Sequence, residues 1–514
     1  MNNLSPIRTA IIALTFLIVV SISASAQTLF PATFATNVNP DAKLKLTFAS
    51  APAVGTKGKI RIYDAANDHL VDTLDMSIPP GPTKPVDPAV RAKNYLAFPY
   101  PYDRTSRPTN KDTKPGTPSA GAVPTSNEYQ LTIIGGFTDG FHFYPITVDG
   151  NTATIHPHHD LLEYGKTYYV QIDREVFAND EFAGVGGKTW TFTTKPKAPR
   201  PTSSLLIVSA DGTGDFNTVQ GAMDFVPDHG KKRVTIKVRN GVYEELVYFR
   251  NKENVTLVGE SRDKTIVRYR NNEVFNPHPA NIRTNPDPGT FPSRRAAMTV
   301  DNSNDIHLVN MTIQTTATGQ AEGLLIAGDR NILSHVTVIG SGDALQANGR
   351  IYMVDSTVEG AGDTILGRGT LFCERCTIRS SRVFMWPRNP KDVHGNVFKD
   401  STFIGTDIPT TIARSPQNDK FTYPFAEVVL LNTTMVNIAP EGWSEADKGG
   451  NVRFWEFNSR NPDGSPVDVS KRVPWSRQLD KIKDAKIISD YSRPEFVFGG
   501  WKPSLEIVVK SDKH

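Results

Sequence analysis

The feature that most constrains the fold of this chain is a pair of nearly identical segments placed twenty residues apart. They are Thr337-Val-Ile-Gly-Ser-Gly-Asp343 and Thr357-Val-Glu-Gly-Ala-Gly-Asp363. Twenty residues make one coil of a β-solenoid, so the repeat predicts that Asp343 and Asp363 lie one coil apart. Adjacent parallel strands are spaced about 4.8 Å, and two carboxylates at that separation cannot both ionise cheaply. We therefore expect one aspartate to keep its proton near neutral pH.

A column of Thr followed by an apolar residue extends the repeat. Successive members are offset by 25, 20, 20, 25 and 32 residues: Thr312, Thr337, Thr357, Thr377, Thr402 and Thr434. Coils of constant core with insertions in loops produce such variation. Short apolar segments precede members of this column, at 306–309, 351–354, 371–373 and 428–431. They indicate strands of a parallel sheet, because helical periodicity is absent.

The first residues indicate export. Arg8 precedes an apolar run over 10–20 that ends in Ala24-Ser-Ala26, the layout of a cleaved secretory signal over residues 1–26. A membrane anchor is the alternative, but this run is shorter than the roughly 20 residues needed to span a bilayer. We expect a secreted or periplasmic protein.

Charge and cysteine content exclude several other classes. A net charge of +3 is too small for a nucleic-acid binder, which would carry a clustered basic face. Cys373 and Cys376 are too few for a disulfide scaffold or a four-ligand zinc site, and the sequence context of a redox C-x-x-C is missing. They occupy the repeat columns of Met353 and Ser356, so we expect them to pack in the solenoid wall.

A proline-rich linker over 196–203 divides the chain into two domains. The first, 27–195, shows the alternation of half-buried antiparallel strands at 43–48, 59–63, 167–172 and 190–193. This pattern predicts a β-sandwich. Tyr168, Ile172 and the segment Trp190-Thr-Phe-Thr-Thr194 resemble bacterial Ig-like domains. Of the 37 prolines, 11 lie between positions 79 and 124, which indicates an irregular surface insertion.

One cluster in the first domain has the residue types of a metal site: His156, His158, His159 and Asp160. On an extended strand His158 and His159 point to opposite sides, and no distant further ligand is identifiable. We interpret the cluster as a solvated turn before Leu161-Leu162, with metal binding as the alternative.

The second domain, 204–507, opens with a strand at 206–209. Val219, Ala222, Met223 and Val226 then follow at helical spacing, which predicts a short helix covering the open end of the first coil. Strands are expected at 234–238 and 255–258.

Several motifs of the second domain resemble, in the same order, the pectin methylesterase family. They are Gly212-Thr-Gly-Asp-Phe216, Gly241-Val-Tyr-Glu-Glu245, Val255-Thr-Leu-Val-Gly-Glu260, Gln320-Ala321, Gly342-Asp-Ala-Leu345, 360–367, Ile412-Ala-Arg414, 438–443 and 472–475. The resemblance covers about residues 204 to 505. It implies an all-β protein, with a right-handed parallel β-helix after the Ig-like sandwich. It also implies hydrolysis of the methyl esters of galacturonate units in pectin, releasing methanol and pectate.

The resemblance gives the two aspartates separate roles. Asp363 matches the nucleophile that attacks the ester carbonyl, and Asp343 matches the acid that protonates methoxide and then accepts a proton from water. Gln320 matches the oxyanion glutamine, and Arg414 matches the arginine that pairs with the nucleophile. A single Asp in such a turn is more often a turn former, but two in register favour catalysis. No metal or other cofactor is required.

Departures from the family pattern affect the substrate site. Gly342 stands where the family has a second oxyanion Gln, and Thr364 and Pro416 stand where it has aromatic residues. Gln346 or another group would have to replace the amide. Trp386 and Arg388 are candidates for sugar binding, although a structural role suits them equally. With Gln320, Gln346 and Arg414 they make up the predicted substrate-binding set.

Two other functions remain open. Carboxylates about 5 Å apart also suit a retaining glycosidase acting on pectin, although the Asp-Asp and Asn-Thr-Asp signatures of those enzymes are not found. A non-catalytic carbohydrate-binding solenoid is the second alternative, because an Ig-like domain is expected and the Gln is missing at position 342. We expect the partner to be pectin, as methyl-esterified homogalacturonan, and not nucleic acid. We also expect a monomer that has no membrane span once the signal is removed.

Overall fold

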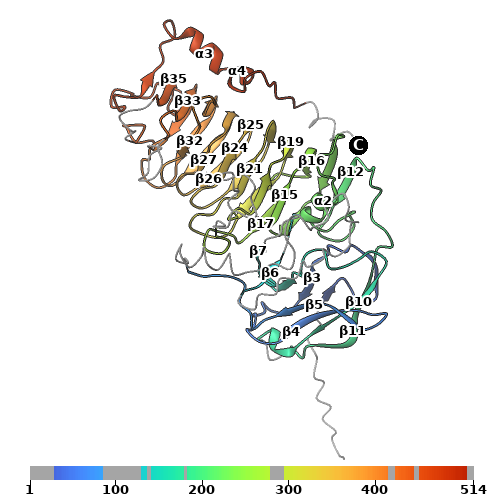
Figure 1. Cartoon of the computed structure of the whole chain (residues 1–514). Coiled ribbons are helices and arrows are strands. Elements are labelled where there is room, and N and C mark those ends of the chain that lie inside the picture. Colours follow the sequence, from blue (N-terminus) through green and yellow to red (C-terminus); the bar gives the residue numbers. More distant parts are fainter. Residues whose placement is uncertain are drawn as a thin grey trace, which may run out of the picture.

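The computed structural model describes residues 28–84, 129–132, 134–135, 141–178, 182–277, 294–414, 423–444 and 451–505. The predicted signal over 1–26 and most of the predicted proline-rich insertion lie outside these residues. A long solenoid of strands dominates the described part, and a smaller β-domain lies beside its first coils (Figure 1). The prediction of an all-β protein is confirmed.

Two sheets form the N-terminal β-domain, in the orders β1-β3-β9-β8 and β2-β11-β10-β4-β5. Alternating residues of the predicted strands, such as Leu44, Leu46, Ile60 and Ile62, are buried and pack into one core between the sheets. All four strands that we predicted here are present, whereas the Ig-like assignment stays a prediction. The strands are β1 (Thr28–Phe30), β2 (Ala35–Val38), β3 (Leu44–Thr47), β4 (Lys59–Asp64), β5 (His69–Asp75), β8 (Ile146–Asp149), β9 (Thr152–Ile155), β10 (Thr167–Ile172) and β11 (Val185–Thr194).

Three parallel sheets form the walls of the solenoid that follows (Figure 1). Thr337 pairs with Thr357 and Leu345 pairs with Ile365, so the twenty-residue repeat is one coil, as predicted. Six members of the Thr column begin successive strands of one sheet, as expected. The fold is a parallel β-helix.

The 11-stranded sheet contains β12 (Leu205–Val208), β13 (Val234–Val238), β16 (Glu253–Gly259), β19 (Asn304–Val309), β22 (Asn331–Ser334), β25 (Arg350–Val354), β28 (Thr370–Glu374), β31 (Asn396–Lys399), β33 (Glu427–Leu431), β35 (Arg453–Phe457) and β36 (Arg477–Gln478). The 8-stranded sheet contains β14 (Gly241–Glu244), β17 (Thr265–Tyr269), β20 (Thr312–Thr315), β23 (Thr337–Ile339), β26 (Thr357–Gly360), β29 (Thr377–Ser380), β32 (Thr402–Gly405) and β34 (Thr434–Val436). The 6-stranded sheet contains β15 (Val247–Arg250), β18 (Met298–Asp301), β21 (Leu324–Ala327), β24 (Leu345–Asn348), β27 (Ile365–Gly367) and β30 (Met385–Pro387).

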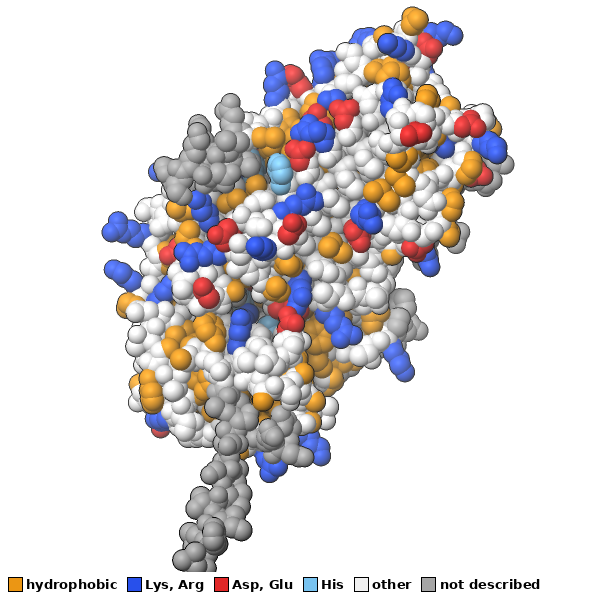
Figure 2. Space-filling view, turned by 180° about the vertical axis from the view of Figure 1, so that it is seen from behind, with side chains coloured by type: hydrophobic (Ala, Val, Ile, Leu, Met, Phe, Trp, Pro, Cys, Tyr) orange, Lys and Arg blue, Asp and Glu red, His pale blue; other side chains and the backbone are white. Residues whose placement is uncertain are grey.

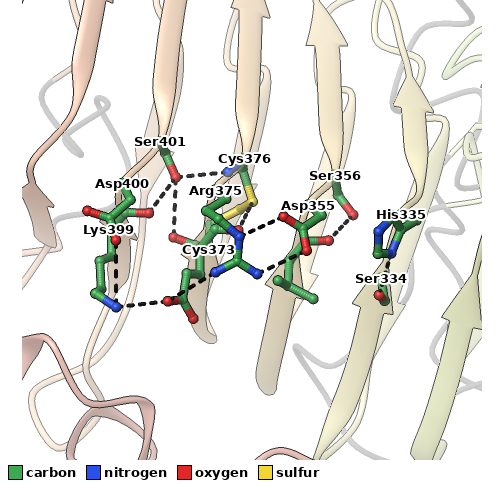
Figure 3. A network of polar contacts seen from close by, with 12 residues as sticks. Ser334, His335, Asp355, Ser356, Cys373, Arg375, Cys376, Lys399, Asp400 and Ser401 are labelled. Atoms are coloured by element: carbon green, nitrogen blue, oxygen red, sulfur yellow. Dashed lines mark hydrogen bonds and ion pairs between the residues drawn. A yellow bond between two sulfur atoms is a disulfide. The ribbon is translucent and has the colours of Figure 1, made fainter. Parts of the chain in front are cut away.

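The turn from the 11-stranded to the 8-stranded sheet repeats in successive coils (Figure 3). One residue of each takes a positive φ, and Asn or Asp, which tolerate this conformation, fill most of these positions: Asn310, His335, Asp355, Arg375, Asp400 and Asn432. Cys373 and Cys376 lie at this turn, almost fully buried in the core, which confirms the predicted packing. They also form a disulfide, which the sequence did not lead us to expect.

Short helices cover parts of the solenoid. The predicted helix is α2 (Val219–Phe225), which contacts β12 and β15 at the first coils, and its N-cap Thr218 accepts a hydrogen bond from the Gly221 N–H. α3 (Ala485–Tyr491) and α4 (Pro494–Val497) pack through apolar side chains against the outer face of the 11-stranded sheet. None of the helices in the described ranges is long and apolar enough to cross a membrane.

The N-terminal β-domain packs against the start of α2. The Asp41 carboxylate accepts hydrogen bonds from the Asn217 and Thr218 N–H groups, at 2.9 and 2.8 Å. Lys195 Nζ, next to the predicted linker, donates to the Gly214 carbonyl at 2.6 Å. These contacts fix the domain on the end of the solenoid.

The same seam overturns our prediction of a solvated turn at the histidine cluster. His156 and His158 are buried, and His158 Nδ1 lies 2.7 Å from Asp72 Oδ1. His159 Nε2 lies 2.5 Å from Asp224 Oδ2 on α2. His159, Asp160 and Asp224 converge as metal ligands could, but a direct hydrogen bond joins two of the three. The turn is buried because α2 packs on it, a contact between distant segments that local sequence does not reveal.

Acidic and basic side chains are interspersed over the face shown in Figure 2. Ion pairs that link successive coils account for part of this pattern, such as Arg330 with Asp305 and Arg350 with Asp329. A mixed surface of this kind agrees with the small net charge.

Candidate active site

Both repeated aspartates lie in the turn between the 8-stranded and the 6-stranded sheets, which we call the acid turn. Asp343 lies two residues before β24, and Asp363 lies two residues before β27. The strands on either side pair in register, and the Asp343 N–H donates to the Gly362 carbonyl at 2.9 Å. Both residues take a positive φ, of 69° and 42°. The two carboxylates therefore project from equivalent positions of adjacent coils, as the repeat predicts.

A third carboxylate continues this column in the coil below. Glu322 lies two residues before β21, which pairs with β24 in the register Leu324 to Leu345. Its side chain is fully buried. Glu322, Asp343 and Asp363 thus occupy one column of three consecutive coils. We missed Glu322 because its flanking residues do not copy the Gly-x-Gly-Asp motif, although alignment on the following strand would have found it.

Two arginines contact this column directly. Arg414 Nη2 lies 2.6 Å from Asp363 Oδ2, the pairing that we predicted. Arg295, which we did not predict, places Nη2 2.9 Å from Asp343 Oδ2. Arg295 Nε also lies 2.9 and 2.8 Å from the two carboxylate oxygens of Glu322. Each aspartate therefore contacts an arginine directly, so the Arg414 contact alone does not distinguish the protonation of Asp363 from that of Asp343.

Burial and charge act in opposite directions on these carboxyl groups. Burial raises the pKa of Asp343, against the opposing charges of Arg295, Arg388 and Arg414. Burial also raises the pKa of Asp363, where Arg414 opposes it and the charge of Asp343 adds to it. Burial raises the pKa of Glu322 to about 7, despite Arg295. All three carboxyl groups of the column therefore have raised pKa values, which favours the protonated form of these groups.

The two oxygens of Asp363 differ in their environment. Oδ2 accepts the hydrogen bond from Arg414. Oδ1 is buried and has no hydrogen-bond partner among the residues that the structure describes. An ionised carboxylate oxygen without a donor keeps its lone pairs available, so Oδ1 can act as a nucleophile.

Gln320 lies in the acid turn of the same coil as Glu322, with its side chain exposed. Its backbone bridges to that of Gly342, whose N–H donates to the Gly319 carbonyl at 2.8 Å. A Cβ at Gly342 would lie 3.1 Å from the same carbonyl oxygen, so the position is tight but not closed to a side chain. Gln320 is therefore next to the predicted gap in the oxyanion site.

The remaining predicted residues lie along the outer face of the 6-stranded sheet. Gln346 pairs with Leu366, which in turn pairs with Trp386, so the three form one outward row. The guanidinium carbons of Arg414 and Arg388 lie 4.0 and 4.5 Å from the centroid of the Trp386 ring, within cation–π range. Trp386 thus contacts both arginines, and its use as a sugar platform stays a prediction.

Arg388 and Arg414 each keep a buried Nε–H without a hydrogen-bond partner among the described residues. Burial, together with the neighbouring charge of Arg368, lowers the pKa of Arg388. Buried donors next to other cations favour an anionic ligand. This end of the acid turn is therefore suited to a negatively charged substrate.

The chain is similar to known pectinesterases. The family model described as Pectinesterase matches residues 205–500. The chain is 26% identical over 326 residues to probable pectinesterase/pectinesterase inhibitor 19 of Arabidopsis thaliana, covering 60% of this chain and 59% of that protein. It is 28% identical over 297 residues to pectinesterase 31 of the same plant, covering 54% and 88%. The chain spans less than two thirds of the length of three of the Arabidopsis relatives that it matches, including pectinesterase/pectinesterase inhibitor 19. Among solved structures, pectin methylesterase from carrot aligns with a TM-score of 0.47 and 20% identity, over 57% of this chain and 93% of that one.

Proposed function

This chain belongs to the pectinesterase family, and we propose that it hydrolyses the methyl esters of galacturonate units in pectin to methanol and pectate. One observation carries the proposal. Asp363 presents a buried Oδ1, without a hydrogen-bond partner in the described ranges, one coil above Asp343, while Arg414 binds its other oxygen. A nucleophile with an acid beside it is the arrangement that ester hydrolysis requires. The family match over residues 205–500 supports our proposal that the activity belongs to a second domain with the bounds 204–507.

We assign the first half of the reaction to the two aspartates. Asp363 Oδ1 attacks the ester carbonyl carbon, and the negative charge moves to the carbonyl oxygen. Gln320 is the candidate donor to that oxyanion. The intermediate collapses to an anhydride between Asp363 and the galacturonyl group. Asp343 gives its proton to the departing methoxide, which leaves as methanol.

Water completes the cycle. Asp343, now ionised, accepts a proton from the attacking water. The anhydride breaks, Asp363 is regenerated as a carboxylate, and the uronic acid releases its proton to solvent and leaves as a carboxylate. No atom or electron is required beyond the ester and one water.

We further propose that the sugar chain lies along the outer face of the 6-stranded sheet. Gln346 and Trp386 lie in one outward row there, and Arg388 follows β30 with an Nε–H that no described residue accepts. Since pectate carries one carboxylate per de-esterified unit, these arginine donors match its charge. Trp386→Ala should then weaken pectin binding both by removing ring surface and by releasing Arg388 and Arg414.

The experiment is to incubate the full chain with highly methylated pectin and to measure methanol and new reducing ends. Methanol without new reducing ends supports the esterase. New reducing ends without methanol would contradict the proposal and favour the glycosidase. Retained pectin binding with neither product would favour a carbohydrate-binding solenoid.

We propose secretion or periplasmic export for the protein. The apolar segment over 10–20 supports this, and the Cys373–Cys376 disulfide agrees with an oxidising compartment. An Ig-like N-terminal domain over 27–195, joined by a linker over 196–203, stays part of the proposal.

A further inference from the structure

We propose that Arg295 and Glu322 are positioning residues that orient the Asp343 carboxyl group and control when it carries a proton. This inference rests on the proposed function, in which Asp343 is the acid and base. It adds a third carboxyl group and a second arginine to the paired aspartates.

The contacts hold Arg295 in a fixed orientation. Its Nε–H is shared by both oxygens of the fully buried Glu322, at 2.9 and 2.8 Å, while Nη2 reaches Asp343 Oδ2 at 2.9 Å. A third carboxylate, Glu273, lies 3.7 Å from Nη1. A planar guanidinium held at one edge by a carboxylate can fix another carboxylate at its other edge. Arg295 thus joins two neighbours of the carboxylate column and sets the direction of Asp343.

Glu322 also limits how strongly Arg295 can favour the ionised form of Asp343. Arg414 contacts one carboxylate directly, Asp363, whereas Arg295 divides its charge among Asp343, Glu322 and Glu273. Arg388 and Arg414 also favour the ionised form of Asp343, so undivided access to Arg295 would add a third full cation. Division of the Arg295 charge with Glu322 and Glu273 therefore helps Asp343 to keep a proton.

The charged groups that face Asp343 are Arg295 and Glu322 from the coils below, Asp363 from the coil above, and Arg388 and Arg414 from the end of the 6-stranded sheet. Loss of Arg295 removes a cation, so Asp343 should hold its proton to a higher pH. Loss of the Glu322 charge removes an anion, and the Arg295 charge then acts more strongly on Asp343. Asp343 should therefore lose its proton at a lower pH. The two changes act in opposite directions, which a purely structural role would not produce.

The test measures methanol release from methylated pectin across pH by Arg295→Met and Glu322→Gln in the full chain. The alkaline limb of kcat reports loss of the Asp343 proton. We expect it at higher pH in Arg295→Met and at lower pH in Glu322→Gln. We also expect kcat to fall by about 10²-fold in Arg295→Met, with KM changed less than about threefold, because general acid–base catalysis is worth 10² to 10⁴. Arg295→Lys keeps the positive charge, so its alkaline limb should lie near that of the wild type, whereas its kcat should recover less completely.

A matched control is Arg375→Met, because Arg375 pairs with Asp355 at the opposite turn of the same solenoid (Figure 3). It should leave both limbs unchanged. If Arg295→Met does not fold, the double variant Arg295→Met/Glu322→Gln removes the unpaired buried carboxylate as well, and its alkaline limb should return toward that of the wild type. Limbs that move in the same direction or not at all, or a change in KM alone, would overturn the proposal.

A second measurement separates this inference from the proposed function. The infrared band of the protonated Asp343 carboxyl, assigned by its loss in Asp343→Asn, can be titrated without substrate. If the wild type released no methanol, the proposed function would fail, and opposite shifts of this band in the two variants would still support the role of Arg295 and Glu322. Shifts in one direction would refute it.

Discussion

Replacement of Arg414 by Met tests the charge balance at the nucleophile. Arg414 Nη2 lies 2.6 Å from Asp363 Oδ2, and 37% of the Arg414 side chain is exposed. A hydrogen bond to a charged group contributes about 1.5 to 3 kcal/mol, and solvent screening places this pair at the lower end, about 1.5 kcal/mol. Arg414 opposes the rise in the pKa of Asp363 that burial causes. Without the arginine, that pKa should rise further.

The consequence is a shift in the acid limb of the pH–rate profile. Attack requires ionised Asp363, so the limb should move to higher pH by about one pH unit, since 1.36 kcal/mol corresponds to one unit. Methanol release at a pH on this limb should fall about tenfold, and Arg414→Lys should lie between the two. The assay is the initial rate of methanol release against pH, with thermal unfolding as a check of folding and Arg375→Met as the control. An acid limb that stayed in place or moved to lower pH would refute the assignment of Arg414 to Asp363.

Three further predictions concern other parts of the molecule. Burial disfavours the charged form of His159, but its two neighbouring aspartates outweigh burial and raise its pKa to about 9, so its stabilising contribution should be complete below pH 6.5 and lost as the pH rises through 9. The thermal midpoint should thus fall more over that range in the wild type than in His159→Gln, and equal slopes would contradict this. Gly342→Gln should fold and raise kcat by about tenfold. This is less than the 10² to 10³-fold effect of one oxyanion donor, because the new Cβ would lie 3.1 Å from a backbone oxygen and would have to move away from it. An unchanged or lower kcat would count against a missing oxyanion donor at Gly342. Reduction of the Cys373–Cys376 disulfide should cost no more than about 2 kcal/mol, given its sequence separation of 3, as measured by unfolding with and without reductant.

The repeat in the sequence was sufficient to predict the solenoid. The Thr column marked the 8-stranded sheet because its six members begin successive strands of that sheet with the same small β-branched residue, and this pattern is local. The register then followed from a simple offset, so the spacing of the repeat alone was enough to place Asp343 and Asp363 on adjacent coils. Arg414 could be placed only through the family resemblance.

The features that we missed depend on contacts between distant segments. Arg295 lies just after a segment of 16 residues outside the described ranges, so the offset from the preceding coil, in which Val247 pairs with Met298, is much longer than the others. Glu322 occupies the aspartate column, but it is a different residue type, and Ala321 stands where a glycine directly precedes each aspartate. The burial of His159 depends on α2 of the second domain. None of these contacts is encoded in the local pattern of the sequence.

The central claim is that Asp363 is the nucleophile and Asp343 its acid and base. The most direct measurement compares methanol release by Asp363→Asn and Asp343→Asn with the wild type, at matched pectin binding and thermal stability. We expect Asp363→Asn to lose about 10⁴-fold or more in kcat with pectin affinity retained, and Asp343→Asn to lose about 10² to 10⁴-fold. Turnover by Asp363→Asn within about tenfold of the wild type would contradict the claim.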